Sequence, residues 1–200
     1  MKRIILFALL CISAVCFQSC STIPSLSGGK TWYTGEESWR DPVGMQVAVE
    51  TKVVEVNKSA YVTAGIGYSL QGSAYEEQSF SGKVTAQYLI APLLYYYQHN
   101  RGFYAECGLQ PSVLLAAKDK YKSGGEGGYN YEGSDDYKDQ MKSFNLGLPV
   151  GAGYRFKNGV GLGIRTIFGL TKNHKEGNSR DMLILLRASV VLQDFMKKRK

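Results

Sequence analysis

Six charged side chains lie on the polar face of strand-like segments that are otherwise rich in apolar residues and glycine. They are two carboxylates and four cations, namely Glu50, Lys52, Glu106, Arg155, Arg165 and Arg187. If the fold brings them together in a narrow interior they must pair, because an isolated buried charge is very costly. We expect Glu50 or Glu106 to pair with Arg155 or Arg165. Such a network would act as a gate or proton path or, in the interpretation that we prefer, as a structural plug.

The two histidines carry no catalytic or metal-binding pattern. His99 belongs to a tight turn and His174 to a long loop, and the two lie far apart in the expected order of strands. A metal site, or a nucleophile with its base, would need side chains that converge. We therefore expect two exposed loop histidines, and we predict no enzymatic activity, no metal and no cofactor.

Residues 123–140, SGGEGGYNYEGSDDYKDQ, form the longest loop that we expect. Segments of this glycine-rich and polar composition are usually mobile, and the carboxylates do not have the spacing of an EF-hand calcium loop. The tyrosines could serve as contacts to an external partner, as they do in antibody paratopes. The candidate contact residues are Tyr129, Tyr131, Asp135, Asp136 and Tyr137.

The elements that must position these residues are β-strands, and the clearest pair spans residues 144–170. Apolar and polar positions alternate along FNLGLPVGAGYRF and again along VGLGIRTIFGL, on either side of a tight turn. A period of two indicates strands with one apolar face, and their length suits a bilayer-crossing strand, which needs about 9–11 residues. Strand-like runs occur at 45–56, 61–71, 83–97, 103–117, 141–156, 160–171 and 182–195.

Seven runs are one short of an even number, and bacterial single-chain membrane barrels have an even number of strands. The connections alternate between short turns (57–60, 98–102 and 157–159) and longer polar loops (72–82, 118–140 and 172–181). A strand must therefore precede the first run, and residues 21–33 are the candidate. Beyond the N-terminus we find no helical periodicity.

Three prolines, Pro92, Pro111 and Pro149, fall inside the expected strands. Each removes one hydrogen bond from a ladder, so proline is normally confined to edges and bulges. We expect bulges or kinks at these positions, or strands that are shorter than the runs.

The two faces of the strands differ in charge. The apolar face carries charge only at strand ends, at Glu55, Lys142 and Asp194. The polar face carries the six residues named above and Lys83, about half the charge density of a soluble surface. It also carries nine glycines, which leave room for long side chains inside a narrow barrel. This balance favours an apolar face that meets lipid; the alternative is a periplasmic lipocalin-like barrel that buries this face around a small apolar ligand.

The N-terminus, MKRIILFALLCISAVCFQSC, has the basic, apolar and small-residue regions of a secretory signal. Two cleavage sites remain open: ordinary cleavage after Ser21, or lipoprotein cleavage that leaves Cys20 as a lipidated first residue. We divide the chain into a signal peptide (1–20), a barrel domain (21–196) and a basic tail (197–200). Only Cys107, and Cys20 in the lipoprotein case, would remain, so no disulfide framework forms within the domain.

The formal net charge of +7 is concentrated at the ends of the chain. Six basic residues lie in the signal peptide and the tail, so the folded body carries +1. This is not the footprint of a nucleic-acid-binding protein. The expected partners are outer-membrane lipid and, through the long loops, other envelope proteins or external ligands.

Two stretches resemble a known family. IAPLLYYYQHNRGFYAECGLQPSVLLAAK and FNLGLPVGAGYRFKNGVGLGIRTIFGLT look like the small outer-membrane β-barrel family common in Bacteroidetes, the PorT-like group. The resemblance covers about residues 84–171 and implies an eight-stranded barrel of the OmpA/OmpX architecture in the bacterial outer membrane. It implies little about activity. The chain departs from the pattern in lacking a recognisable glycine-rich first strand and in continuing for five residues after Phe195.

We therefore predict an all-β protein, an antiparallel up-and-down transmembrane β-barrel of eight strands. Its lumen would be filled by side chains, because eight strands leave no aqueous channel. The expected role is structural or one of surface interaction.

Overall fold

The computed structural model describes residues 21–34, 39–40, 43–77, 80–124, 130–175 and 179–197. The predicted signal peptide with Cys20, and residues 198–200 of the predicted tail, lie outside this part of the chain. Among the described residues no helix has the length and apolar character needed to cross a membrane. The strands are β1 (Thr22–Thr34), β2 (Trp39–Arg40), β3 (Val43–Asn57), β4 (Ala60–Glu77), β5 (Phe80–Ile90), β6 (Leu93–Gln98), β7 (Phe103–Gly124), β8 (Asn130–Asp136), β9 (Phe144–Arg155), β10 (Val160–Gly169) and β11 (Arg180–Val190).

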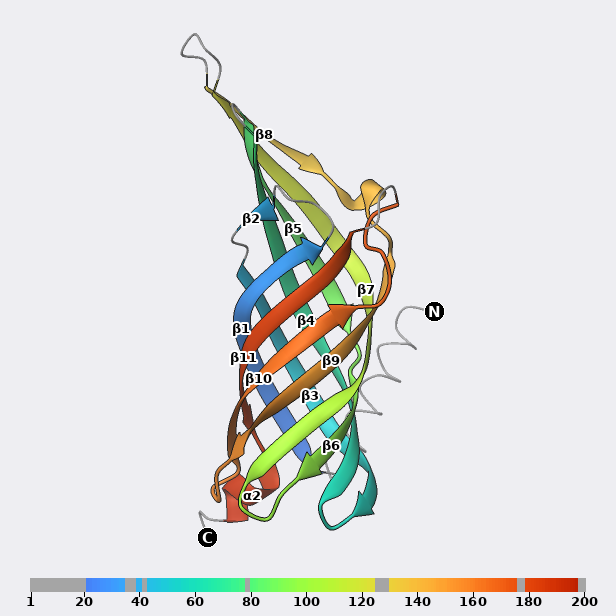
Figure 1. The fold of residues 1–200 in the computed structure, drawn as a ribbon, viewed down its shortest axis with the longest axis vertical. Coiled ribbons are helices and arrows are strands. Elements are labelled where there is room, and N and C mark those ends of the chain that lie inside the picture. Colours follow the sequence, from blue (N-terminus) through green and yellow to red (C-terminus); the bar gives the residue numbers. More distant parts are fainter. Residues whose placement is uncertain are drawn as a thin grey trace, which may run out of the picture.

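The strands form a closed antiparallel ring, which confirms the predicted fold class (Figure 1). Around the ring β1 pairs with β3, then follow β4, β5 with β6, β7, β9, β10 and β11, and β11 pairs with β1 again. β5 and β6 both lie between β4 and β7, so they are two halves of one interrupted strand. Counted in this way, the ring has eight strands, and β2 and β8 lie outside it.

β1 occupies the segment 21–33 that the alternation of turns and loops required. Its ladder with β11 aligns Leu26 with Ala188, and its ladder with β3 aligns Leu26 with Val47. Because β1 pairs with β11 on one side and with β3 on the other, it removes both open edges of the sheet. The apolar–polar alternation of β1 is weak because the strand is rich in glycine and small polar residues.

Two predicted long loops are largely strand. β4 continues to Glu77 and pairs with β5 from Phe80, so most of 72–82 is a hairpin. β7 continues to Gly124, and β8 folds back along it, so much of 118–140 is also paired. Figure 1 shows these strands projecting past the ring at the end opposite α2. The prediction was wrong because strands that are polar on both faces lack the alternation that identifies a half-buried strand.

The last strand ends earlier than predicted. β11 stops at Val190, and residues 192–195 of the expected strand belong instead to the short helix α2 (Leu192–Lys197). The helix lies at the end of the ring where the short turns lie (Figure 1). The backbone N–H of Thr22 donates to Gln193 Oε1 over 3.1 Å, which attaches α2 to the start of β1. Phe195 therefore belongs to a helix, and the period-two pattern that we extended to it does not describe its surroundings.

The prolines act in two ways. Pro92 lies at the break between β5 and β6, where the ladder along this strand is interrupted. Pro111 and Pro149 remain inside β7 and β9, but residues 108–109 of β7 and 148–149 of β9 do not pair with one another. Tight turns close the other end of the ring, with glycine at positive φ at Gly102 (97°) and Gly159 (84°), where residues with a side chain are disfavoured.

The outer face of the ring is apolar around its middle. Leu186 is 68 %, Leu26 55 % and Ile164 53 % exposed, although large apolar side chains are usually buried in water. This is the reverse of the lipocalin-like alternative. Residues 144–170 behave as predicted, because the apolar positions of their alternation face outward at Phe144, Val150, Tyr154, Leu162, Ile164 and Phe168.

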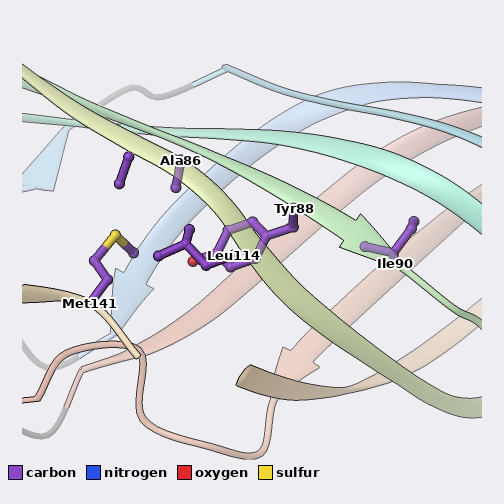
Figure 2. Close-up of a cluster of buried hydrophobic side chains, with 6 residues drawn as sticks. Ala86, Tyr88, Ile90, Leu114 and Met141 are labelled. Carbon is purple, nitrogen blue, oxygen red and sulfur yellow. The ribbon is translucent and has the colours of Figure 1, made fainter. Parts of the chain in front are cut away.

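At the loop end the two faces exchange roles. In β5 the side chains of Val84, Ala86, Tyr88 and Ile90 are buried inside. Leu89 and Lys83 are exposed on the outer face, although we predicted Lys83 on the inner one. Figure 2 shows the inward side chains meeting β7 and the segment after η1 (Lys138–Gln140). The prediction for Lys83 failed because this end is built like a soluble barrel. We call these residues the loop-side cluster: Ala86, Tyr88, Ile90, Leu114, Ala117 and Met141.

Candidate functional site

Four of the six predicted charged residues meet at the centre of the ring. Each carboxylate accepts hydrogen bonds from both arginines: Arg165 lies 3.1 Å from Glu50 and 2.5 Å from Glu106, and Arg187 lies 3.0 Å and 3.2 Å from the same two carboxylates. All four side chains are at most 2 % exposed. We call this group the central cluster.

The central cluster is electrically balanced, with two carboxylates and two guanidinium groups. Its members come from β3, β7, β10 and β11, so it crosslinks strands on opposite sides of the ring. The hydroxyl of Tyr96 donates to Glu50 Oε2 over 2.9 Å and adds β6 to the network. Charge-assisted hydrogen bonds of this kind are the strong ones, and full pairing is what makes a buried cluster tolerable.

Glycines make the space that the cluster fills. A Cβ at Gly151 would lie 2.7 Å from Glu106 Oε1, and a Cβ at Gly65 would lie 2.9 Å from Cγ of Glu50. Both distances are closer than non-bonded atoms approach. The expectation that inward glycines accommodate long side chains therefore holds at these two positions.

An aromatic layer lies between the central cluster and the turn end. The rings of Tyr61 and Tyr96 are stacked with their centroids 5.2 Å apart, and Tyr104 lies 6.0 Å from Tyr96. Offset stacking is a favoured arrangement of aromatic pairs. Ile23, Leu94 and Val191 pack in the same cluster. This layer closes the lumen a second time, below the charges.

Lys52 and Arg155 lie on the other side of the aromatic layer and do not join the central cluster. Within the described part of the chain, neither makes an ion pair with a carboxylate, so the expected pairing of Arg155 does not occur. Instead Arg155 Nη1 donates to the hydroxyl of Tyr61 over 2.6 Å and to Gln98. Lys52 Nζ lies 4.2 Å from the centroid of the Tyr61 ring. Both cations therefore contact Tyr61 at the turn end of the barrel.

The sequence argument did not identify the tyrosines of this layer. Tyr61, Tyr96 and Tyr104 are buried at inward positions, but only charged side chains were considered there. A signal was present in β7: Tyr104 lies two residues before Glu106, so the two share a face.

Polar side chains fill the lumen on the loop side of the central cluster. Gln46 Nε2 donates to the hydroxyl of Ser69 over 3.1 Å, and Gln71 Nε2 donates to the same oxygen over 3.2 Å. Asn145 Nδ2 donates to the hydroxyl of Tyr88 over 3.3 Å, where the loop-side cluster begins. The lumen is therefore occupied along its length.

Asp181 lies at the loop-side rim, three residues beyond the exposed Lys30 in the β1–β11 ladder and so beyond the apolar belt. Its Oδ1 accepts a hydrogen bond from Asn173 Nδ2 over 2.5 Å. Burial raises the pKa of the Asp181 carboxyl to about 7, and the hydrogen bond from Asn173 acts in the opposite direction.

The predicted contact loop is only partly described. Tyr129 and the side chain of Tyr131 lie outside the described residues, whereas Asp135 and Asp136 are exposed on β8. Tyr137 instead packs against the loop-side cluster, with its ring centroid 5.7 Å from that of His174.

The histidines do not converge. His174 is 8 % exposed rather than exposed as predicted, because the segment around it pairs with Met141 and covers the loop end of the barrel. His99 lies in a turn at the other end, where its Nδ1 accepts from the N–H of Arg101 over 3.3 Å. Among the described residues no group of three or more His, Cys, Asp or Glu side chains could hold a metal.

Comparisons with known proteins give one family and several similar folds. Residues 28–175 match the family described as outer membrane protein beta-barrel domain. Neisserial surface protein A (NspA) is similar with a TM-score of 0.53 and 11 % identity, over 87 % of this chain and 99 % of that one. Ail of Yersinia pestis has a TM-score of 0.44 and 14 % identity, over 86 % and 95 %. The outer membrane enzyme PagL has a TM-score of 0.45 and 13 % identity, over 84 % and 98 %. No curated protein sequence matches the chain.

Proposed function

The chain belongs to the outer membrane protein beta-barrel domain family, and we propose that it acts there as a filled, non-conducting barrel with a structural or surface-interaction role. The observation that carries the proposal is the central cluster. Glu50, Glu106, Arg165 and Arg187 occupy the middle of the lumen without exposure to solvent. A charged layer that is balanced and crosslinked by four ion pairs leaves no unneutralised charge to attract an ion.

A pore would need the opposite arrangement, with charges that line an open lumen and face water. The aromatic layer of Tyr61, Tyr96 and Tyr104 adds a second closure on the turn side. The lumen is thus blocked by two layers of different chemistry, and opening it would require the coordinated movement of several strands.

We also propose that the protein is not an enzyme. His99 and His174, the natural candidates for a general base, lie at opposite ends of the barrel. His174 is packed against Tyr137, and His99 belongs to a tight turn. Nucleophilic catalysis requires a base that converges with a nucleophile and an orienting group, and these two histidines do not converge with one another.

The surface role would fall to the strands that project past the ring. β4 with β5, and β7 with β8, extend the protein beyond the apolar belt and carry exposed acidic residues at Asp135 and Asp136. Charged residues at such a site influence the rate and the choice of a partner. We propose that the partners are envelope proteins or external ligands that meet this extension.

Export through the signal peptide at 1–20, lipidation at Cys20 and membership of the PorT-like group form part of the same proposal. The support is the sequence pattern described above. Mass measurement of the mature protein separates the two cleavage sites, because a lipidated chain beginning at Cys20 is heavier than a chain cut after Ser21. A mature mass that fits neither would contradict both.

Planar-bilayer recording tests the closed lumen. We expect the native barrel to give no channel steps, and a variant in which the four residues of the central cluster are alanine should also give none, because the aromatic layer still closes the lumen. Folding is checked beforehand by a shift in gel mobility between unheated and boiled samples. Steady conductance by the native barrel would overturn the proposal.

The outward position of the extension is tested by labelling intact cells with a membrane-impermeant maleimide. We expect Ser134→Cys on β8 to react and Ser59→Cys in the turn between β3 and β4 to remain unlabelled, both in a Cys107→Ser background. The opposite result would reverse the orientation.

A further inference from the structure

A hollow interrupts the outer apolar face of the barrel near its turn end. Its volume is about 630 Å³, which lies within the range of about 300–1,000 Å³ of small-molecule pockets. The hollow extends over β6, β7, β9 and β10, and its lining is almost wholly apolar. Because it is continuous with the lipid-facing belt, hydrocarbon rather than water fills it.

One row of the sheet produces the hollow. The β7–β9 ladder places Ala105 directly opposite Ala152. On one side the row continues to Tyr97 of β6, and on the other to Ile164 of β10. Directly opposed residues lie on the same face of a sheet, and both alanines are exposed on the outer face. Two small side chains therefore form the floor of the hollow, between the larger side chains of Tyr97 and Ile164.

Aromatic side chains border the hollow on its turn side. Phe103 opposes Tyr154, and their rings meet edge to face with centroids 5.2 Å apart. The ring of Phe156 contacts that of Tyr154 in the same way, with centroids 5.0 Å apart. Aromatic girdles of this kind lie where a membrane barrel meets the head groups of the lipid. The hollow therefore lies in the hydrocarbon region, next to the head groups of the leaflet at the turn end.

The two turns beside the hollow are basic. The turn after β6 contains His99 and Arg101, the turn after β9 contains Lys157, and neither turn contains a carboxylate. All three side chains are exposed, and His99 itself lines the hollow. Nδ1 of His99 accepts from the N–H of Arg101 over 3.3 Å. In the neutral ring the hydrogen therefore lies on Nε2, which can donate to a ligand.

We propose that this hollow binds one acyl chain of an anionic phospholipid, whose head group is held by Arg101 and His99 in the adjoining turn. A guanidinium presents its donors as a planar fork that matches the oxygens of a phosphate. The excess of positive charge at the two turns favours a head group with a net negative charge. A free anion would leave the apolar floor uncovered, and a zwitterionic lipid would gain less from the cations.

The test compares two lipid classes at the hollow by tryptophan fluorescence in vesicles. The probe is Tyr97→Trp in the full-length mature protein, with Trp32→Phe and Trp39→Phe to remove the native tryptophans. The vesicles mix brominated phosphatidylcholine, which quenches the probe, with unbrominated phosphatidylglycerol. We expect a preference of about fivefold for phosphatidylglycerol at this probe. Leu26→Trp, on the outer face of β1 across the ring from β7, should report no preference.

Filling the hollow separates the role of the acyl chain from that of the head group. In the Tyr97→Trp background, Ala152→Leu should remove the preference, and Ala105→Leu provides the same test if the first variant fails to fold. Ala64→Leu is the matched control, because it enlarges an outward alanine of β4 that lies opposite Leu93 and away from the hollow. It should leave the preference unchanged. Arg101→Gln should also lower the preference, through the head group.

Two outcomes would overturn the proposal. Equal preference at Tyr97→Trp and Leu26→Trp would show that the hollow is ordinary lipid-facing surface. Loss of the preference in Arg101→Gln but not in Ala152→Leu or Ala105→Leu would assign it to the charge of the turn alone. The outcome does not depend on whether the lumen conducts.

Discussion

The middle of the barrel and its loop end differ in which face of the strands is apolar. In the middle the apolar face is outside, and at the loop end it is inside. In the middle, Glu106 and Arg165 lie inside while Ile164 and Leu186 are exposed outside. At the loop end, Val84 and Ala86 lie inside while Lys83 and Lys118 are exposed outside. Both arrangements keep the strand period of two, so the period does not reveal the inside of the barrel. What differs is the solvent: the apolar face turns toward lipid in one region and away from water in the other.

The comparison also explains why the paired charges lie in the middle. Where the outer surface is apolar, the interior must be filled without adding to the apolar surface that the chain already carries. The central cluster does this with hydrogen-bonded ion pairs that link β3, β7, β10 and β11. Farther toward the loop end, where Lys83 and Lys118 are exposed outside, buried apolar side chains such as Ala86 and Ala117 fill the interior.

The largest effect should come from breaking the central cluster. Glu106→Gln leaves two guanidinium groups with one carboxylate, and we expect it to lower the free energy of unfolding by about 3–5 kcal/mol. Guanidinium-induced unfolding in detergent micelles measures the change. Glu55→Gln, at an exposed position near the turn, is the matched control. Similar midpoints for the two variants would show that the ion pairs do not hold the middle together.

The next effect tests the outer face of each region. Ile164→Arg places a charge in the apolar belt and should destabilise the barrel in bilayers by about 2–4 kcal/mol. Thr85→Arg places the same charge on the outer face of β5 at the loop end and should change stability by about 0.5 kcal/mol or less. Reversible unfolding from lipid vesicles gives both values. Equal costs would mean that the two outer faces meet the same solvent.

A smaller effect should report how tightly the middle is filled. A Cβ at Gly147 would lie 2.8 Å from Cγ2 of Ile167, so Gly147→Ala should cost about 1–3 kcal/mol through overpacking. The cost should fall in an Ile167→Ala background, because the clashing methyl group is absent, and a double-mutant cycle measures this coupling. Gly28→Ala, which meets no atom within 4 Å, is the control. Additive costs would rule out contact between the two sites.

The smallest effect concerns the rim of the loop end. The folded-state pKa of Asp181 is about 7, above the value of an unfolded aspartate. The folded state therefore holds the proton more tightly than the unfolded chain, and stability should fall as the pH rises from about 4 to about 7. Asp181→Asn should flatten this slope, because the variant has no carboxyl to titrate at this position. Unfolding midpoints at pH 5 and pH 8 provide the check; an unchanged slope in the variant would assign the dependence to other groups.

Several features of the site followed from particular residues. The alternation over 144–170 was enough to place Arg155 and Arg165 on one face and Leu162 and Ile164 on the other. The need for an even number of strands was enough to locate β1. The partner of Arg155 could not be predicted in this way, because alternation gives the face of a residue but not its height in the barrel. The height of a residue along the barrel axis depends on strand tilt and on the register between strands. Arg155 lies on the turn side of the aromatic layer for this reason.

The sequence by itself determined the strand period, the positions of the turns and the number of strands around the ring, because each depends on local alternation and on chain connectivity. Only the tertiary structure decided which face lies inside at each height, where β4 and β7 leave the ring, and that residues after Val190 turn into α2. It also decided that Glu50, Glu106, Arg165 and Arg187 meet while Lys52 and Arg155 do not. The physical reason is that these outcomes depend on the solvent outside each level of the barrel and on the stagger of its strands, which no single segment encodes.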